Sequence, residues 1–292
     1  MSTRCLFDFL EIPPSVRSVG GTNAAVGARL RAAAALAVAL LFVAPLVFMI
    51  TGSLRSVGTP PRTPQLWPSP VRVESYDKVF GLTDLGRQLV NSTIVVGLTV
   101  PITLIVASSA GFAAAMLGRR IATTVVLMSL IALMIPATSL MVGRLVVFRR
   151  LGLTDTLLSL VAPALIGTSP LYALLFYWAF RRLPRELLEA AVLEGMRPVA
   201  IWWRVALPLV RPVVVAVAVL TAVTSWSNVL DPLIYLSDPR LFTVPLGLRN
   251  LAQLDRGQHP ILLAGAVIST LPVVLACLVA QRSMRGTRWV GT

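Results

Sequence analysis

The chain alternates between long apolar stretches and short charged ones. Six windows lack Asp, Glu, Lys and Arg, and each is 19 to 31 residues long. About 20 apolar residues suffice for a helix to cross the ~30 Å hydrocarbon layer of a bilayer, and helices satisfy their own backbone groups there. The pattern therefore predicts an all-α integral membrane protein with six transmembrane helices. The windows are 32–54, 88–118, 121–143, 156–180, 212–230 and 257–281.

These windows define one domain with a tail at each end. We predict a poorly ordered tail at residues 1–31, the six-helix domain at 32–284 and a second tail at 285–292. Composition agrees with this class, because 56% of the residues are hydrophobic and 13% are charged, whereas about a quarter are charged in soluble domains. An even number of spans places both tails on the same side of the membrane.

Proline marks the expected irregularities. The loop at 52–91 is proline-rich, so we expect it to run extended before a short helix near Tyr76–Phe80. The second span is expected near Thr93–Leu117. Pro101 and Pro136 lie inside the second and third windows, and proline is a common cause of helix kinks.

The basic residues predict the orientation. With the N-terminus inside, the inner segments hold 15 of the 26 Lys and Arg residues and the outer segments hold 11. Basic residues accumulate on the cytoplasmic side, so we expect both termini in the cytoplasm. The net charge of +14 does not indicate a nucleic-acid partner, because the arginines are spread over short segments between apolar spans. The inner segments are 1–31, 119–120, 181–211 and 282–292.

The segment 181–211 is the most charged part of the chain, and its pattern predicts two short helices. Pro184 is suited to the first turn of one helix, and Gly195 is suited to the left-handed residue that ends it. Pro198 can open a second helix, which Pro208 ends or kinks. Composition alone is also compatible with an amphipathic hairpin resting on lipid headgroups.

The spacing within this segment resembles the cytoplasmic coupling loop of ABC importer permeases. That pattern is Glu-Ala-Ala, three residues, Gly, nine residues, Ile, one residue, Leu-Pro. Val205 replaces the usual Ile. The resemblance implies a loop that docks into a groove of a separate ATP-hydrolysing subunit. The matching residues are Glu189, Ala190, Ala191, Gly195, Val205, Leu207 and Pro208.

Further stretches resemble the sugar and glycerol-phosphate branch of these permeases, over roughly residues 32–284. The C-terminal tail departs from the usual ending of that branch. The resemblance implies half of a translocation pathway for a carbohydrate, a sugar or a polyol phosphate, in a bacterial inner membrane. A permease for another solute remains an alternative. The matching stretches are Leu66–Ser69, Asn91–Ser92, Met134–Pro136, Leu151–Thr156, Trp226–Ile234 and Phe242–Leu248.

The resemblance also implies the partners: a second homologous permease subunit, two ATPase subunits and an extracytoplasmic solute-binding protein. The sequence also indicates that ATP and Mg²⁺ are bound by another chain. A phosphate-binding P-loop requires Gly-Lys-Ser/Thr, whereas the only lysine, Lys78, follows Tyr-Asp. We predict no cofactor and no metal on this chain, because two distant cysteines and one histidine offer no ligand spacing.

The chemistry of the remaining residues is sparse. His259 is the only histidine and is expected to be an ordinary loop residue before the last span, so we predict no enzyme activity. An ion-coupled carrier commonly holds ionisable residues in mid-membrane, and the six windows contain none. Aromatic and amide groups suited to a sugar could equally be packing or interfacial residues. These candidates for the solute pathway are Trp226, Asn228, Tyr172 and Tyr177.

Overall fold

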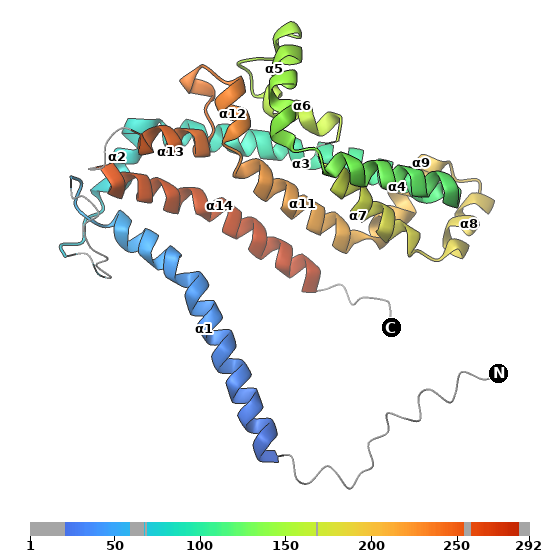
Figure 1. Ribbon diagram of the computed structural model, residues 1–292, viewed down its shortest axis with the longest axis horizontal. Helices are drawn as coiled ribbons and strands as arrows, with labels where there is room; N and C mark the ends of the chain where they lie inside the picture. Colours follow the sequence, from blue (N-terminus) through green and yellow to red (C-terminus); the bar gives the residue numbers. More distant parts are fainter. Residues whose placement is uncertain (1–20, 59–66, 68, 168, 254–257, 286–292) are drawn as a thin grey trace. The chain divides into compact units, whose positions relative to one another are not determined.

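The computed structural model describes residues 21–58, 67, 69–167, 169–253 and 258–285. This part of the chain is all-helical, in agreement with the predicted fold class (Figure 1). The chain forms two compact units, Met1–Thr51 and Gly52–Thr292. The first contains most of helix α1, and the second contains all the other helices.

The longer helices, in chain order, are α1 (Gly21–Ser53), α2 (Glu74–Thr83), α3 (Leu85–Met116), α4 (Arg119–Leu133), α5 (Met141–Arg150), α6 (Leu158–Leu165), α7 (Pro170–Arg181), α8 (Arg185–Leu193), α11 (Arg211–Trp226), α12 (Leu230–Tyr235), α13 (Val244–Ala252) and α14 (His259–Arg285). The short pieces are the 3₁₀-turns η3 (Ala137–Leu140) and η5 (Pro239–Leu241), the π-turn η4 (Ile201–Ala206), and α9 (Pro198–Ala200) and α10 (Leu207–Leu209).

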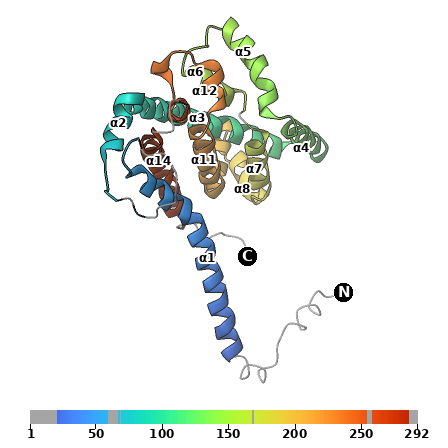
Figure 2. The same ribbon diagram turned by 60° about the vertical axis from the view of Figure 1, so that its left-hand side comes forward.

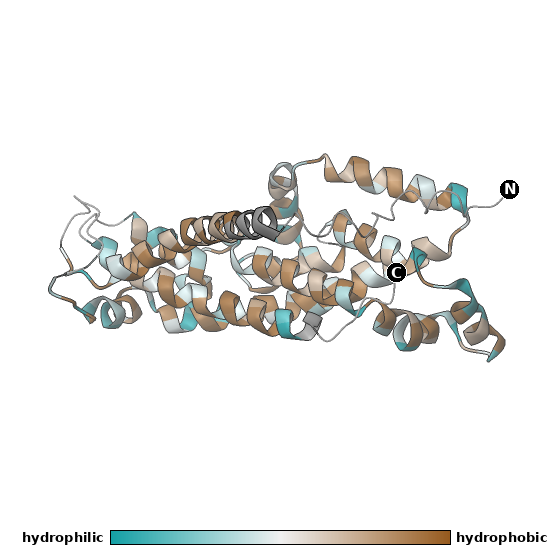
Figure 3. Cartoon of the chain, turned by 90° about the horizontal axis from the view of Figure 1, so that it is seen from below, coloured by the Kyte–Doolittle hydropathy of each residue, from teal (hydrophilic) through white to brown (hydrophobic). Residues whose placement is uncertain are grey.

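Within the described residues three helices are long and apolar enough to span a membrane, and the number reaches the predicted six if each of three bent helix pairs forms one span. Three are single helices, within α1, α3 and α14. The other three are pairs of helices that meet at a bend: α4 with η3 and α5, α6 with α7, and residues 198–209 with α11. Figure 3 shows brown, apolar residues along the helices and teal, polar residues mainly at helix ends and turns.

Three predicted boundaries were wrong. Helix α1 begins at Gly21, within the predicted tail, although its apolar span begins at Ala32 as expected; residues 1–20 lie outside the described chain. Helix α3 begins at Leu85, not near Thr93, because polar residues of its first turns find partners on α13 and its approach. His259 is the first residue of α14 rather than a loop residue.

The two prolines have different effects on their helices. Helix α3 continues through Pro101, which is exposed. At Pro136 the third span breaks, and its halves are bent by 84°. The residues just before that proline are exposed, Met134 at 84% and Ile135 at 52%. Proline removes a backbone hydrogen bond at this point, and these exposed neighbours make no close contact that would hold the two halves in line.

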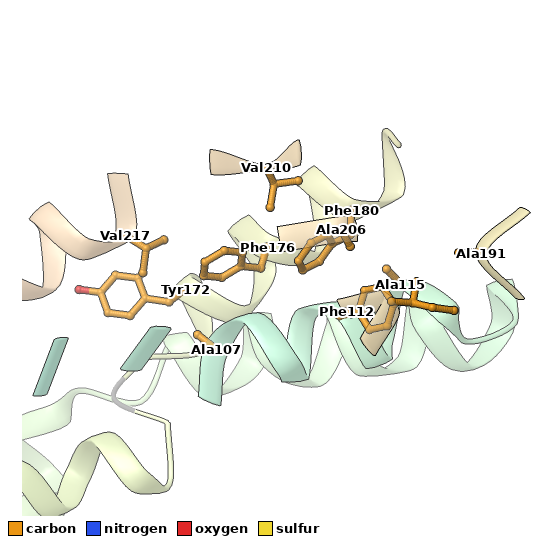
Figure 4. Packing of buried hydrophobic residues seen from close by; sticks show 11 residues of the cluster. Ala107, Phe112, Ala115, Tyr172, Phe176, Phe180, Ala191, Ala206, Val210 and Val217 are labelled. Atoms are coloured by element: carbon orange, nitrogen blue, oxygen red, sulfur yellow. The ribbon is translucent and has the colours of Figure 1, made fainter. Parts of the chain in front are cut away.

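Helix α3 is the centre of the second unit, and α7 is its closest neighbour. A Cβ on Gly111 of α3 would lie 2.7 Å from the backbone oxygen of Ala173 and 2.8 Å from the backbone nitrogen of Tyr177. Only glycine permits this approach. Next to it, Phe180 meets Phe112 edge-on at 5.4 Å and stacks on Phe176 at 5.9 Å. These rings form the middle of the main core (Figure 4).

The opposite end of α3 is fastened by side-chain hydrogen bonds. Asn91 Nδ2 donates to the backbone oxygens of Arg240 (2.9 Å) and Phe242 (3.1 Å). The backbone N–H of Val244 donates to Ser92 Oγ at 2.9 Å. Helices α2 and α13 lie at this end of α3, and α8 and α9 lie at the other (Figure 1); Figure 2 also shows α2 and α8 well apart.

Candidate functional site

The segment with the coupling-loop spacing forms the predicted pair of short helices; we call residues 185–209 the hairpin. Helix α8 ends in a Schellman motif: Met196 N–H donates to the Ala191 carbonyl at 3.1 Å, and Gly195 N–H donates to the Val192 carbonyl at 2.9 Å. Gly195 has φ +77°, the left-handed conformation that this motif requires of its residue after the cap. The glycine therefore fixes where the chain reverses.

The second arm of the hairpin contains a π-turn immediately before Pro208. Residues Ile201–Ala206 are π-helical, and Pro208 follows within α10. Proline has no N–H to donate to the carbonyl four residues earlier, and its ring clashes with that carbonyl. A π-turn widens the helix there and so makes room for the ring. The arm ends at Val210, and α11 leaves at 87°. The predicted kink is confirmed, and it lies two residues after the proline.

One face of the hairpin is buried in the main core. Ala191 is 6% exposed, Ile201 4% and Ala206 0%. All three belong to the cluster that contains Phe176 and Phe180 of α7 (Figure 4). Val205 and Leu207 of the motif are half-buried against the same cluster, with Leu188 and Met196. The hairpin is thus packed onto α7 and α3 by apolar contacts.

The other face of the hairpin is exposed, and much of it is apolar. Glu189, Ala190, Gly195 and Pro208 of the motif are exposed. Large apolar side chains are exposed to a similar extent on the spanning helices, so those of this face can be covered by a partner or by lipid. Helical spacing places Leu187 and Val192 on the same apolar face as Leu188 and Ala191, but in the structure only the latter two pack against the core. The exposed apolar side chains of this face are Leu187 (46% exposed), Val192 (60%), Leu193 (89%), Val199 (71%) and Trp203 (57%).

A groove of about 1100 Å³ separates α8 from the turn between α3 and α4. Its walls combine apolar side chains with three arginines and one carboxylate, Glu189. Glu189 therefore stands at the edge of this groove and on the exposed face of the hairpin. The lining residues are Ala115, Met116, Leu117, Gly118, Arg119, Arg181, Arg185, Leu188, Glu189, Val192 and Leu193.

Two of the predicted pathway residues, Trp226 and Asn228, lie at the turn between α11 and α12, where each has a partner. Trp226 Nε1 donates to the Ser269 carbonyl of α14 at 3.1 Å. Asn228 Oδ1 accepts from the Asp231 N–H at 3.2 Å, and its Nδ2 donates to Asp231 Oδ2 at 2.7 Å. Asn228 thus stabilises the turn that leads into α12, just before its N-cap residue Val229. In this conformation Trp226 joins α11 to α14, and Asn228 makes only a local contact.

The other two, Tyr172 and Tyr177, lie on α7 and not beside the first pair. Tyr172 is 6% exposed and belongs to the main core, where its ring lies beside Val217 of α11 (Figure 4). Tyr177 is half-buried against the same cluster. Both tyrosines are packing residues here, and their role in a solute pathway stays a prediction.

A second hydrogen-bonded junction joins the loop between α5 and α6 to the approach to α13. Asp155 Oδ1 accepts from the N–H groups of Ser237 and Asp238, each at 2.9 Å, and its own N–H donates to the Tyr235 carbonyl at 2.9 Å. The two donated bonds lower the pKa of Asp155, because they stabilise its charged form. Asp155 has φ +59°, so the contact holds a conformation that is unfavourable for most residues.

Comparison with protein families gives one match that covers most of the chain. Residues 84–287 match the family described as the binding-protein-dependent transport system inner membrane component. The match includes α3 to α14 and therefore the entire hairpin.

Individual relatives are similar over most of their own length. The arabinooligosaccharides transport system permease protein AraQ of Halalkalibacterium halodurans is 30% identical over 218 residues, which are 74% of this chain and 77% of that protein. The trehalose transport system permease protein SugB of Mycobacterium tuberculosis is 27% identical over 243 residues, 82% of this chain and 87% of the relative.

A solved structure has the same fold. It is a crystal structure of a bacterial ABC transporter involved in the import of the acidic polysaccharide alginate. The TM-score is 0.74 at 20% identity, and the match covers 88% of this chain and 96% of the other. A second structure, of a bacterial alginate transporter with its pentasaccharide-bound periplasmic protein, matches with a TM-score of 0.63 at 13% identity, over 90% and 96% of the two chains.

Proposed function

Since this chain belongs to the family of inner membrane components of binding-protein-dependent transport systems, we propose that it is one of two transmembrane permease subunits of an ATP-driven importer. The family description makes such a component a membrane protein that works with a solute-binding protein. Our proposal adds a second homologous permease and two ATPase subunits, which bind ATP and Mg²⁺. It also places both termini in the cytoplasm.

The hairpin is our proposed docking site for one ATPase subunit. The observation that most supports this docking site is that the residues of the Glu-Ala-Ala motif are divided between the exposed and the buried face of α8. Ala191 is buried in the core formed by α3 and α7, whereas Glu189 and Ala190 are exposed on the same helix. A subunit bound to the exposed face of the hairpin can therefore move α7 through the apolar contacts of the buried face. Packed cores transmit such rigid-body displacements because they deform little.

We propose a carbohydrate, either a sugar or a polyol phosphate, as the solute. Two observations support this class: the sequence stretches around Trp226–Ile234 and Phe242–Leu248, and the arabinooligosaccharide, trehalose and alginate named for the relatives and for a protein of the same fold. The solute-binding protein is expected to meet the outer segments, 52–91 and 231–260. A non-sugar solute would leave the hairpin and its role unchanged.

Reconstituted transport tests this proposal. The four-subunit complex is placed in vesicles with its binding protein and a radiolabelled oligosaccharide. We expect uptake that requires internal ATP and the binding protein and that a protonophore leaves unchanged. Uptake that continues without ATP and stops with the protonophore would instead identify an ion-coupled secondary transporter.

A single backbone change separates coupling from assembly in the same assay. Gly195→Pro cannot keep φ +77°, because proline fixes φ near −65°. We expect normal insertion but uptake reduced by at least tenfold. Gly143→Ala is the matched control, since a Cβ there meets nothing within 4 Å and φ is not positive. Wild-type uptake in the Gly195→Pro variant would refute the coupling role.

A further inference from the structure

The groove between α8 and the α3–α4 turn carries an excess of positive charge. Arg119 begins α4, Arg181 ends α7 and Arg185 begins α8, so three separate helix ends contribute one guanidinium group each. Glu189 is the single carboxylate of the lining. Among the described residues no carboxylate forms an ion pair with any of the three arginines. The lining therefore has a net charge of +2, from three arginines and one glutamate.

Most of the remaining lining is apolar and exposed. Met116 is 50% exposed, Leu117 38% and Val192 60%. Met116 is the last residue of α3, a 32-residue apolar helix of spanning length, and Leu117 follows it. The groove thus opens where an apolar span ends. In a bilayer this is the level of the headgroups, with hydrocarbon on one side and water on the other.

We propose that this groove binds the headgroup of an anionic phospholipid. The three guanidinium groups hold the phosphodiester, since arginine binds phosphate oxygens in a bidentate manner. The acyl chains lie against Met116 and Val192. Basic pockets between membrane helices on the cytoplasmic side are suited to acidic headgroups. An occupant with both an anionic end and a hydrocarbon end matches this lining better than a soluble anion, which would leave the apolar part uncovered.

One wall of this site is formed by the hairpin, and Glu189, Val192 and Leu193 belong both to the groove and to the exposed face of the hairpin. A bound lipid would therefore contact part of the proposed ATPase docking face. Lipid binding itself depends on neither the solute nor ATP, so it can be measured without transport.

The test is native mass spectrometry of the full chain, co-expressed with its partners, after addition of phosphatidylglycerol or phosphatidylcholine. We compare the wild type with Arg119→Gln/Arg181→Gln/Arg185→Gln. A control variant, Arg120→Gln/Arg182→Gln/Arg197→Gln, removes the same charge from three exposed arginines that do not line the groove. We expect the wild type to retain phosphatidylglycerol in preference to phosphatidylcholine. The groove variant should retain on the order of tenfold less phosphatidylglycerol than the wild type, and the control variant should stay within twofold of the wild type.

Several outcomes would overturn the proposal. Equal losses in both triple variants would show a general effect of surface charge. Displacement of the lipid by millimolar inorganic phosphate would show a soluble-anion site. Loss of the ATPase from the groove variant with unchanged lipid binding would make the groove part of the protein interface. Arg119→Gln alone, at an exposed first residue of α4, repeats the test if the triple variant does not fold, with a smaller expected loss of about fivefold.

Discussion

Both ends of α3 pack on a buried apolar cluster, but only one of them adds hydrogen bonds from side chains to its neighbours. At one end the hairpin is packed through buried apolar side chains such as Ala191, Ile201 and Ala206. At the other end, Asn91 and Ser92 of α3 form hydrogen bonds with the backbone of residues 240–244, beside a second cluster that contains Leu85 and Val244.

This difference indicates which end of α3 is suited to motion. Apolar burial is non-directional, so a packed hairpin can tilt together with α7 and lose little contact. Hydrogen bonds depend steeply on distance and angle, so residues 240–244 keep one position relative to α3 until several bonds break together. We therefore expect the hairpin to transmit movement and residues 240–244 to resist it.

The largest effect is expected where α3 supports the hairpin core. In Gly111→Val, the new side chain meets backbone atoms of α7 at less than 3.0 Å, and backbone cannot move aside as a side chain can. We expect about 3 kcal/mol of destabilisation and loss of the ATPase from the purified complex. Thermal unfolding in detergent measures the first. Gly97→Ala in the same helix is the control, since a Cβ there meets nothing within 4 Å, and a stable Gly111→Val protein would contradict the close packing.

The next effect concerns the hydrogen-bonded end. Asn91→Ala removes two bonds and leaves the carbonyls of Arg240 and Phe242 without this donor. We expect a loss of about 2 kcal/mol and faster amide exchange in residues 240–244, while exchange in the hairpin stays unchanged. Thr93→Ala is the control, because its exposed hydroxyl bonds only within its own helix, to Leu89. An equal loss of protection from amide exchange at both ends of α3 would contradict the proposed difference between the two ends.

A smaller effect is expected from Gly195→Ala. A Cβ there meets nothing within 4 Å, and the cost comes only from φ +77°, about 1 kcal/mol for a non-glycine residue. We expect a small fall in melting temperature and partial uptake, between those of the wild type and Gly195→Pro. An alanine variant as inactive as the proline variant would mean that the glycine has a role beyond its backbone conformation.

The smallest effect is a pH dependence at Asp155. Its pKa lies below the ordinary value of 3.8 because the Asp238 and Ser237 amides donate to it. A lowered folded-state pKa gives stability that is present above pH 3.8 and is lost as pH falls through the folded pKa. Exchange of the two amides, followed by mass spectrometry below pH 4, should show their loss of protection. Asp155→Asn should abolish that pH dependence, and a dependence that persists would implicate another group.

Much of the architecture could be predicted from the sequence. Charge-free windows indicate six spans because charges are costly in lipid, and Gly195 and Pro208 carry their conformational requirements in their own covalent structure. The positions that depend on tertiary contacts could not be predicted. Helix α3 starts at Leu85 because its polar first turns are buried against α13, and the third span bends by 84° at Pro136 although α3 continues through Pro101, a difference that the residue type alone does not indicate.

The candidate site, too, could be predicted only in part. The spacing from Glu189 to Pro208 identified the hairpin, but it did not indicate that Ala191 is buried while Ala190 is exposed. Trp226 and Asn228 were selected for their chemistry, and the structure gives each a partner within the fold. Residue type indicates which bonds a side chain can make, whereas only packing determines which partner it has.

Co-purification of the ATPase subunit tests the central claim most directly. We compare Leu193→Asp, a change on the exposed face of α8 at 89% exposure, with Ala191→Asp, a change on the buried face at 6%. Our account predicts that Leu193→Asp keeps the wild-type melting temperature and loses the ATPase by at least tenfold, because the charge stays in water until docking. Ala191→Asp should lose both stability and the ATPase. A Leu193→Asp chain that retains the ATPase at wild-type stoichiometry would contradict docking on this face.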